Sequence, residues 1–196
     1  LKGWGDDLSK IKAPLGVYSV LGNHDYGEYT SWKSNEEKNR NFKNLLKAQK
    51  EFGWNLLLNE NDTISVDGNK IKVIGVENWA SSRFQQYGDL DKAYNGLNNE
   101  DFKILMTHNP SHWNAKVTDA YNDIDLTLSG HTHGLQYGID IGDFRVSPVR
   151  LAYKQWADLY ELNKQYIYVN RGFGFMGYPG RVGILPEITI LELKKS

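Results

Sequence analysis

Short apolar runs alternate along the 196-residue chain with polar stretches that contain glycine, asparagine or aspartate. Runs of about four to eight apolar and β-branched residues between such turn signals are typical of strands. Two pairs of runs predict hairpins, one turning at residues 67–69 and the other near Gly142. We expect strands at residues 15–21, 55–59, 63–66, 71–76, 102–107, 124–128, 136–141, 143–146, 165–170 and 188–193.

One long helix is predicted between Ser34, which forms a capping box with Glu37, and the stop signal Gly53. Apolar residues recur within it at helical spacing and should face the core: Phe42, Leu45, Leu46 and Phe52. Shorter helices are expected at residues 89–97 and 111–119. Because strands and helices interleave, we predict α/β layers in a single domain over residues 1–196.

Composition narrows the possible functions. Hydrophobic residues make up 40% of the chain and the net charge is −1, as in an ordinary soluble globular protein. Lysine and arginine form no basic stripe, so we expect no nucleic-acid partner. The chain has no cysteine, which excludes disulfides, zinc thiolate sites and a cysteine nucleophile. No apolar run reaches the roughly 18 residues that a membrane span needs.

The most informative stretch is Gly130-His131-Thr132-His133-Gly134, which directly follows the apolar run 124–128. Side chains two residues apart on an extended backbone point to the same face. We therefore expect the two imidazoles to lie side by side at the end of a strand, as a metal site requires. A pair of surface histidines in a turn would show the same short pattern.

The positions of the other histidines favour the metal site. Of the five histidines, His24, His108, His131 and His133 follow an apolar run in a loop flanked by glycine or proline. Because α/β folds assemble their sites at strand ends, this shared setting favours one common site. His112 lacks the setting, and we expect it to be a surface or helix histidine.

These residues carry a resemblance to a known family. Gly22-Asn23-His24-Asp25, then His108, then Gly130-His131-Thr132-His133 resemble the third, fourth and fifth motifs of the calcineurin-like metallophosphoesterase superfamily. The resemblance covers essentially the whole chain and is nearest to a bacterial, often membrane-anchored phosphodiesterase branch. It implies a metallophosphoesterase-type α/β/β/α sandwich of two mixed sheets, here lacking the first strands.

The resemblance also implies roles for individual residues. His24 would be the uncoordinated acid that stabilises the phosphoryl oxygens or protonates the leaving group, and Asp25 would orient His24. Four side chains would bind a two-metal centre: Asn23, His108 and His131 at one ion, and His133 at the other.

The chemistry of such a centre follows from general principles. Two divalent cations lower the pKa of a shared water and clamp the attacking and leaving oxygens of a phosphate ester. Nitrogen-rich ligands favour Mn, Fe, Zn or Ni over Mg or Ca. The implied reaction is hydrolysis of a phosphomonoester or phosphodiester by a hydroxide that bridges two metals, on a small-molecule or lipid-linked substrate.

The family's first two motifs, Asp-x-His and Gly-Asp, are not convincingly present. Gly5-Asp6-Asp7 resembles the second, but only four residues precede it, too few for a strand. We interpret it as a coincidental match. Because those motifs supply the carboxylate that bridges the ions, we expect this chain to be an N-terminally truncated part of a membrane-anchored protein. Alone it should bind metal weakly and turn over poorly, and the anchor should lie outside these residues.

Other functions stay open. A nuclease is disfavoured by the charge balance, whereas a non-catalytic metal-binding or scaffold domain would lack the upstream motifs altogether. A purely structural domain with incidental histidines would bind no metal. An aromatic rim would suit an apolar or lipid-linked phosphoester, and several loop residues could form one or could simply pack the loops: Trp79, Arg83, Trp113, Trp156, Phe173, Phe175 and Arg181.

Overall fold

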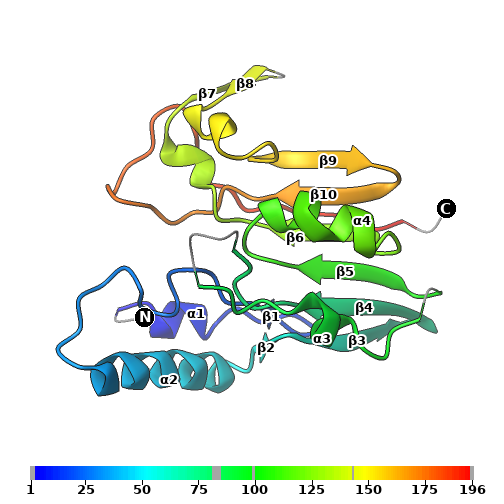
Figure 1. Ribbon diagram of the computed structural model, residues 1–196, viewed down its shortest axis with the longest axis horizontal. Coiled ribbons are helices and arrows are strands. Elements are labelled where there is room, and N and C mark those ends of the chain that lie inside the picture. Colours follow the sequence, from blue (N-terminus) through cyan, green and yellow to red (C-terminus); the bar gives the residue numbers. More distant parts are fainter. Residues whose placement is uncertain (1–2, 81–84, 99, 143, 195–196) are drawn as a thin grey trace. The chain divides into compact units, whose positions relative to one another are not determined.

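The computed structural model describes residues 3–80, 85–98, 100–142 and 144–194. The chain divides into two compact units, Leu1–His108 and Asn109–Ser196, each with a mixed sheet and helices (Figure 1). Arg83, a predicted rim residue, lies outside the described residues. No helix in the described ranges is both long enough and apolar enough to cross a bilayer.

The first unit contains a mixed sheet in the order β3-β4-β5 (Figure 1). Strands β3 (Glu60–Val66) and β4 (Asn69–Gly75) form an antiparallel hairpin, and β4 pairs in parallel with β5 (Phe102–Met106). The hairpin turns through Asp67 and Gly68, which both have positive φ, as a tight two-residue turn requires. The predicted hairpin and the strand at residues 102–107 are confirmed.

Helix α2 (Asn35–Glu51) begins and ends where the sequence predicts. The Ser34 hydroxyl accepts the N–H of Glu37 at 3.2 Å, as an N-cap should. The Glu37 carboxylate accepts the N–H of Lys33 at 2.9 Å, one residue before the position expected for a capping box. Gly53, with a φ of +76°, ends the helix.

The remaining elements of the first unit are short. Strands β1 (Tyr18–Ser19) and β2 (Asn55–Leu56) form a two-stranded parallel pair, so both predicted strands are present but much reduced. Helix α3 (Leu90–Tyr94) occupies part of the helix expected at residues 89–97. Asp6 and Asp7 lie on helix α1 (Gly5–Leu8).

The second unit contains a mixed sheet with β10 (Gln165–Val169) at its centre. Strand β10 pairs in parallel with β6 (Leu126–Ser129) and antiparallel with β9 (Asp158–Leu162). A separate antiparallel hairpin joins β7 (Ile139–Ile141) to β8 (Phe144–Val146), as predicted. The sheet places β6, which leads toward the two histidines, beside the central strand.

The helices of the second unit are also short. A helical stretch over residues 111–120 contains the π-helix η1 (Trp113–Val117) followed by α4 (Thr118–Ala120), which confirms the helix predicted at 111–119. Two 3₁₀ segments, η2 (His133–Gln136) and η3 (Pro148–Leu151), lie in loops.

His112, predicted to be a surface or helix histidine, is a helix residue with a buried side chain. Its side chain is 0% exposed, next to the buried Trp113 at the start of the helical stretch. Burial, together with the nearby Lys116, lowers the pKa of His112 to about 3. The imidazole is therefore neutral at neutral pH.

The strand predicted at residues 188–193 is absent. The apolar residues still alternate, but Ile188 and Ile190 are 85% and 92% exposed. An alternating segment becomes a strand only when a neighbouring backbone pairs with it. Among the described strand pairs, none involves residues 188–193.

Candidate metal centre

In the first unit, the loop after β1 brings Asn23 against His108, which follows β5. The Oδ1 atom of Asn23 and the Nε2 atom of His108 lie 2.9 Å apart. The Nδ2 group of Asn23 donates a hydrogen bond to the Tyr29 hydroxyl at 2.9 Å. The amide therefore turns its oxygen toward the imidazole, and two predicted metal ligands lie in contact.

Gly22 makes room for the imidazole of His108. A Cβ atom on Gly22 would lie 2.7–2.9 Å from three atoms of the ring, a distance that real Cβ atoms essentially never show. Gly22 is fixed by its neighbour Asp25, whose Oδ2 accepts the Gly22 N–H at 2.7 Å while the Asp25 N–H donates to the Gly22 carbonyl at 3.1 Å. Glycine is needed here because the ring packs directly on the backbone.

His24 stacks on Tyr29, with ring centroids 4.4 Å apart and planes inclined by 24°. In the described structure no hydrogen bond joins Asp25 to His24, because the Asp25 carboxylate is bound to the Gly22 N–H. Burial raises the pKa of Asp25, an effect that the Gly22 N–H and the His24 charge oppose. Tyr29 thus contacts both His24 and Asn23.

In the second unit, the backbone that carries His131 and His133 is not extended. The sequence analysis assumed an extended backbone there, and this assumption was wrong. Strand β6 ends at Ser129, and the two histidines have φ values of +69° and +51°. The chain turns at once, with the Thr132 N–H donating to the Gly130 carbonyl at 2.8 Å. The Thr132 hydroxyl donates to the Trp156 carbonyl at 2.7 Å in the buried interior.

The turn continues in an unusual conformation. All four residues of η2 have φ values between +51° and +57°. A left-handed backbone costs non-glycine residues roughly 1–2 kcal/mol each, so surrounding contacts must hold it. The Ser147 hydroxyl donates to the Gly134 carbonyl at 2.8 Å, and one nitrogen of the Arg181 guanidinium lies 3.4 Å from the His133 carbonyl oxygen.

Gln136, which is 0% exposed, joins this turn to the glycine-rich loop after β10. Its Nε2 group donates to the carbonyls of Tyr178, at 2.9 Å, and Gly180. Its Oε1 accepts the N–H of Met176. One buried amide therefore fixes the loop that passes the His133 ring, where a Cβ on Gly174 would lie 3.9 Å from Cε1.

His131 is held by Tyr153. The Nε2 atom of His131 lies 2.7 Å from the Tyr153 hydroxyl, and the two rings meet edge to face with centroids 5.3 Å apart. Tyr153 packs on a small apolar core: Val149, Trp156, Ala157 and Ile184. A hydrogen bond to one ring nitrogen fixes the orientation of the other, as is usual for histidines that bind metals.

The loop residues considered for an aromatic rim differ in exposure. Trp113 and Trp156 are 1% and 7% exposed and pack in the interior, whereas Phe173 and Phe175 are exposed. Arg181 donates to the backbone carbonyls of Arg171 and Gly174 at 3.0 and 2.8 Å, and so is a loop-binding residue.

One pair of the donor atoms present fits a metal ion. In the described ranges, no group of three or more His, Cys, Asp or Glu side chains has the arrangement of a metal site. Asn23 and His108, however, present an oxygen and a nitrogen 2.9 Å apart. Two ligands with bonds of about 2.1 Å at a right angle lie roughly 3 Å apart, so this pair fits a transition-metal ion.

Two functional candidates escaped the sequence analysis. Tyr29 lies four residues beyond Asp25 in the same loop, and Tyr153 lies in a segment whose structure the apolar pattern left undefined. Neither belongs to a short motif. The only sequence signal was a high aromatic content near the predicted ligands, which did not distinguish these tyrosines from packing residues.

Comparison with known proteins identifies the family. Residues 2–135 match the family model described as calcineurin-like phosphoesterase. The matched region spans more than half of the chain. The chain belongs to the calcineurin-like phosphoesterase family. The predicted superfamily and its α/β fold with mixed sheets are confirmed.

The curated relatives are longer proteins. The metallophosphoesterase YkuE of Bacillus subtilis is 32% identical over 191 residues, which cover 96% of this chain and 60% of that protein. A transmembrane protein with a metallophosphoesterase domain from Bos taurus is 31% identical over 196 residues, covering 96% of this chain and 41% of that protein.

Solved structures show weaker similarity. The match to the NAD nucleotidase NadN of Haemophilus influenzae covers 79% of this chain and 33% of the NadN chain, with 21% identity and a TM-score of 0.46. The match to a Thermus thermophilus sulfate thiohydrolase, SoxB, covers 78% of this chain and 27% of the SoxB chain, with 14% identity and a TM-score of 0.47.

Proposed function

We propose that the protein hydrolyses a phosphomonoester or phosphodiester at a centre of two divalent transition metals. Membership of the calcineurin-like phosphoesterase family supports phosphoester hydrolysis and divalent metal binding as the general chemistry. The observation that carries the proposal is the contact between Asn23 Oδ1 and His108 Nε2, two donor atoms that come from loops 85 residues apart. Mn, Fe, Zn or Ni would suit these ligands.

In the proposal, each histidine-bearing loop contributes ligands. Asn23, His108 and His131 bind one ion, and His133 binds the other. A metal at Nδ1 of His131 would leave the contact between Nε2 and Tyr153 intact. When bound, the ions would supply positive charge against the phosphoryl oxygens and lower the pKa of water toward neutrality.

His24 is the proposed general acid, and Tyr29 and Asp25 are its proposed supports. Stacking on Tyr29 restrains the His24 ring, and Asp25 closes the backbone turn that carries it. A restrained imidazole can donate a proton to a leaving oxygen or a hydrogen bond to a phosphoryl oxygen without first becoming ordered. Asp25 therefore orients His24 through the loop backbone.

Ligand number limits the proposed activity. Asn23 and the three histidines are neutral ligands, and no carboxylate among the assigned ligands is available to bridge two ions. We therefore propose weak metal binding and poor turnover by these residues alone. We also propose that both units belong to one catalytic domain, since the family match crosses the boundary between them.

Substrate and location are further parts of the proposal. The substrate is a small-molecule or lipid-linked phosphoester. Relatives from Bos taurus and Danio rerio are named transmembrane proteins with a metallophosphoesterase domain, which supports membrane association of a parent protein. The chain spans 60% of the Bacillus subtilis relative and 43% of the Danio rerio one.

Calorimetric titration with Mn²⁺ or Zn²⁺, followed by an assay with bis(4-nitrophenyl) phosphate, tests the proposal. We expect weak binding that His108→Ala abolishes and Asn41→Ala, on the exposed face of α2, leaves unchanged. Any metal-dependent hydrolysis should fall by about a hundredfold or more in His24→Ala while metal binding persists. Metal binding without hydrolysis would favour a non-catalytic metal-binding domain, and hydrolysis indifferent to His24 would contradict its role as the acid. No metal binding would overturn the site.

A further inference from the structure

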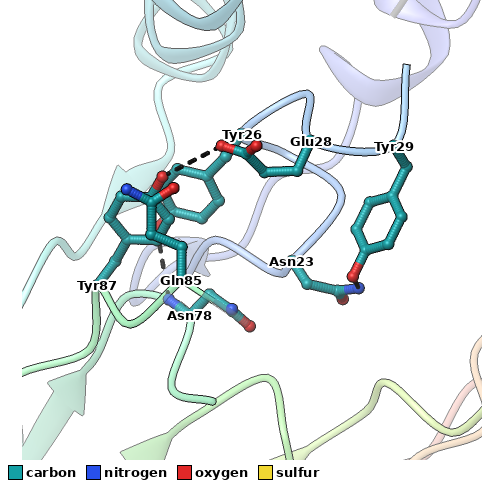
Figure 2. A pocket seen from close by; sticks show the side chains of 7 residues that line it. All are labelled: Asn23, Tyr26, Glu28, Tyr29, Asn78, Gln85 and Tyr87. Atoms are coloured by element: carbon teal, nitrogen blue, oxygen red, sulfur yellow. Dashed lines mark hydrogen bonds between the residues drawn. The ribbon is translucent and has the colours of Figure 1, made fainter. Parts of the chain in front are cut away.

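A pocket lies beside Asn23 in the first unit. Its volume is about 380 Å³, within the range of pockets that hold small ligands. Figure 2 shows Asn23 and Tyr29 on one side of it, and Tyr26, Tyr87 and Asn78 on the other. The pocket therefore shares the Asn23 side chain with the proposed metal centre.

Asn78, at the wall of this pocket, has a side-chain amide with unused hydrogen-bonding capacity. The residue is only 3% exposed, and its backbone is bound by the Tyr26 hydroxyl and by the N–H groups of Tyr87 and Gly88. Its side-chain amide makes no hydrogen bond within the described part of the chain. In Figure 2 the amide points away from the tyrosine pair, toward the side where Asn23 lies. The amide lines the pocket without a partner in the described part of the chain, so a ligand in the pocket can form hydrogen bonds with it.

Another part of the pocket wall is a rigid apolar surface formed by stacked rings. Tyr26 and Tyr87 stack with centroids 3.9 Å apart and planes inclined by 4°, and Phe42 of α2 stacks on Tyr26 at 5.3 Å. The Tyr26 hydroxyl donates to Glu77 at 3.1 Å. This wall is therefore fixed before any ligand arrives, which lowers the entropic cost of binding.

Among the described residues that line the pocket, no cationic side chain is available to pair with an anion. Glu28 is the only charged residue among the seven described residues that line it. Its Oε1 atom accepts from Lys38 at 2.7 Å and lies 3.4 Å from the Tyr87 hydroxyl. Because Lys38 pairs with this carboxylate, the lining offers oxygens that accept from hydroxyl groups but no uncompensated charge, which favours a neutral ligand.

We propose that this pocket binds the alcohol part of the phosphoester, and that this alcohol is neutral and rich in hydroxyl groups, as in a sugar or another polyol. The Asn78 amide can both donate to and accept from hydroxyl groups, Glu28 can accept from them, and the flat tyrosine wall fits a ring face. This inference rests on the proposed function, because the pocket is a leaving-group site only if the metal centre hydrolyses phosphoesters. The pocket's affinity for the alcohol can be measured without metal.

The test is an NMR titration of ¹⁵N-labelled, metal-free protein with methyl ribofuranoside, compared with cyclohexanol, a ring of similar size with one hydroxyl. We expect the riboside to shift the side-chain NH₂ signals of Asn78, which are identified by their loss in Asn78→Leu. The dissociation constant should rise by about fivefold or more in Asn78→Leu, as expected for a lost hydrogen bond. Asn41→Leu, the same change on an exposed helix face, should leave it unchanged.

Asn78→Asp, which keeps the size and one acceptor but removes the donor, provides a second variant if Asn78→Leu fails to fold. Equal affinities in wild type and Asn78 variants, equal affinities for both probes, or no shift at all would overturn the proposal. Failure of the proposed function has a different signature. Riboside binding that depends on Asn78 would then persist in a protein that binds no metal and hydrolyses no ester.

Discussion

The Tyr29 hydroxyl accepts a hydrogen bond from the Nδ2 group of Asn23 and thereby points the amide oxygen at His108. An asparagine amide has two ends of nearly equal size, so only its hydrogen-bond partners decide which end faces a metal. Here the nitrogen is engaged by Tyr29, and the oxygen faces the Nε2 atom of His108. Tyr29 is therefore a positioning residue for the proposed ligand.

Tyr29→Phe should weaken metal binding by about fivefold, because the stack on His24 persists while the acceptor for Asn23 is lost. Tyr29→Leu should weaken it by a similar factor, since the additional lost contact is with His24, which is not a proposed ligand. Calorimetric titration with Zn²⁺ measures the effect. Tyr166→Phe, on the exposed β10 face, is the matched control and should bind like wild type. Wild-type affinity in Tyr29→Phe would contradict the positioning role.

Gly22→Ala should destabilise the protein by about 1–3 kcal/mol, because the new methyl group would overlap the His108 ring. The ring must move away from Asn23, so metal binding should fall as well. Gly5→Ala is the control: nothing lies within 4 Å of its Cβ position, and alanine is the better residue within helix α1. Chemical denaturation should show a loss for the first variant only, and equal stabilities would refute the packing argument.

Gln136→Leu should lower the stability of the second unit by about 1–3 kcal/mol. The substitution leaves the carbonyls of Tyr178 and Gly180 without their donor, and the left-handed turn after His131 without its buried tie. Thermal unfolding followed by circular dichroism measures the change. A variant with the wild-type melting temperature would show that the turn is held by other contacts.

His112 makes the free energy of unfolding depend on pH in the acid range. Its pKa is about 3 in the folded protein and about 6.5 in an unfolded chain, so the unfolded state binds more protons between these values. Stability should therefore fall as the pH drops from 6.5 toward 3, by up to about 1.4 kcal/mol per pH unit from this residue. His112→Gln should flatten the profile measured by urea unfolding, and an unchanged slope would exclude His112 as its source.

Local signals in the sequence predicted most elements well. Helix α2 carries a cap, an apolar stripe and a glycine stop, and the β3–β4 hairpin carries Asp67 and Gly68 at the turn. These features act over a few residues, so one sequence suffices to recognise them. The strand expected at residues 188–193 depends instead on a distant pairing partner, which alternation cannot supply.

The candidate site was predictable in composition but not in arrangement. The ligand types followed from Asn23, His108, His131 and His133 and from their resemblance to a family. The conformation of His131 and His133 did not, because Ser147, Gln136 and Arg181 hold a left-handed turn through contacts made from other loops. The roles of Tyr29 and Tyr153 likewise depend on contacts that no motif records.

The most direct test of the central claim is the imidazole ¹⁵N spectrum of histidine-labelled protein during titration with Zn²⁺. The chain has five histidines, and single substitutions to Gln assign them. We expect ring nitrogens of His108, His131 and His133 to acquire the shifts of coordinated nitrogen, while those of His24 and His112 do not. Coordination of His112, or no coordinated histidine at saturating Zn²⁺, would contradict the account.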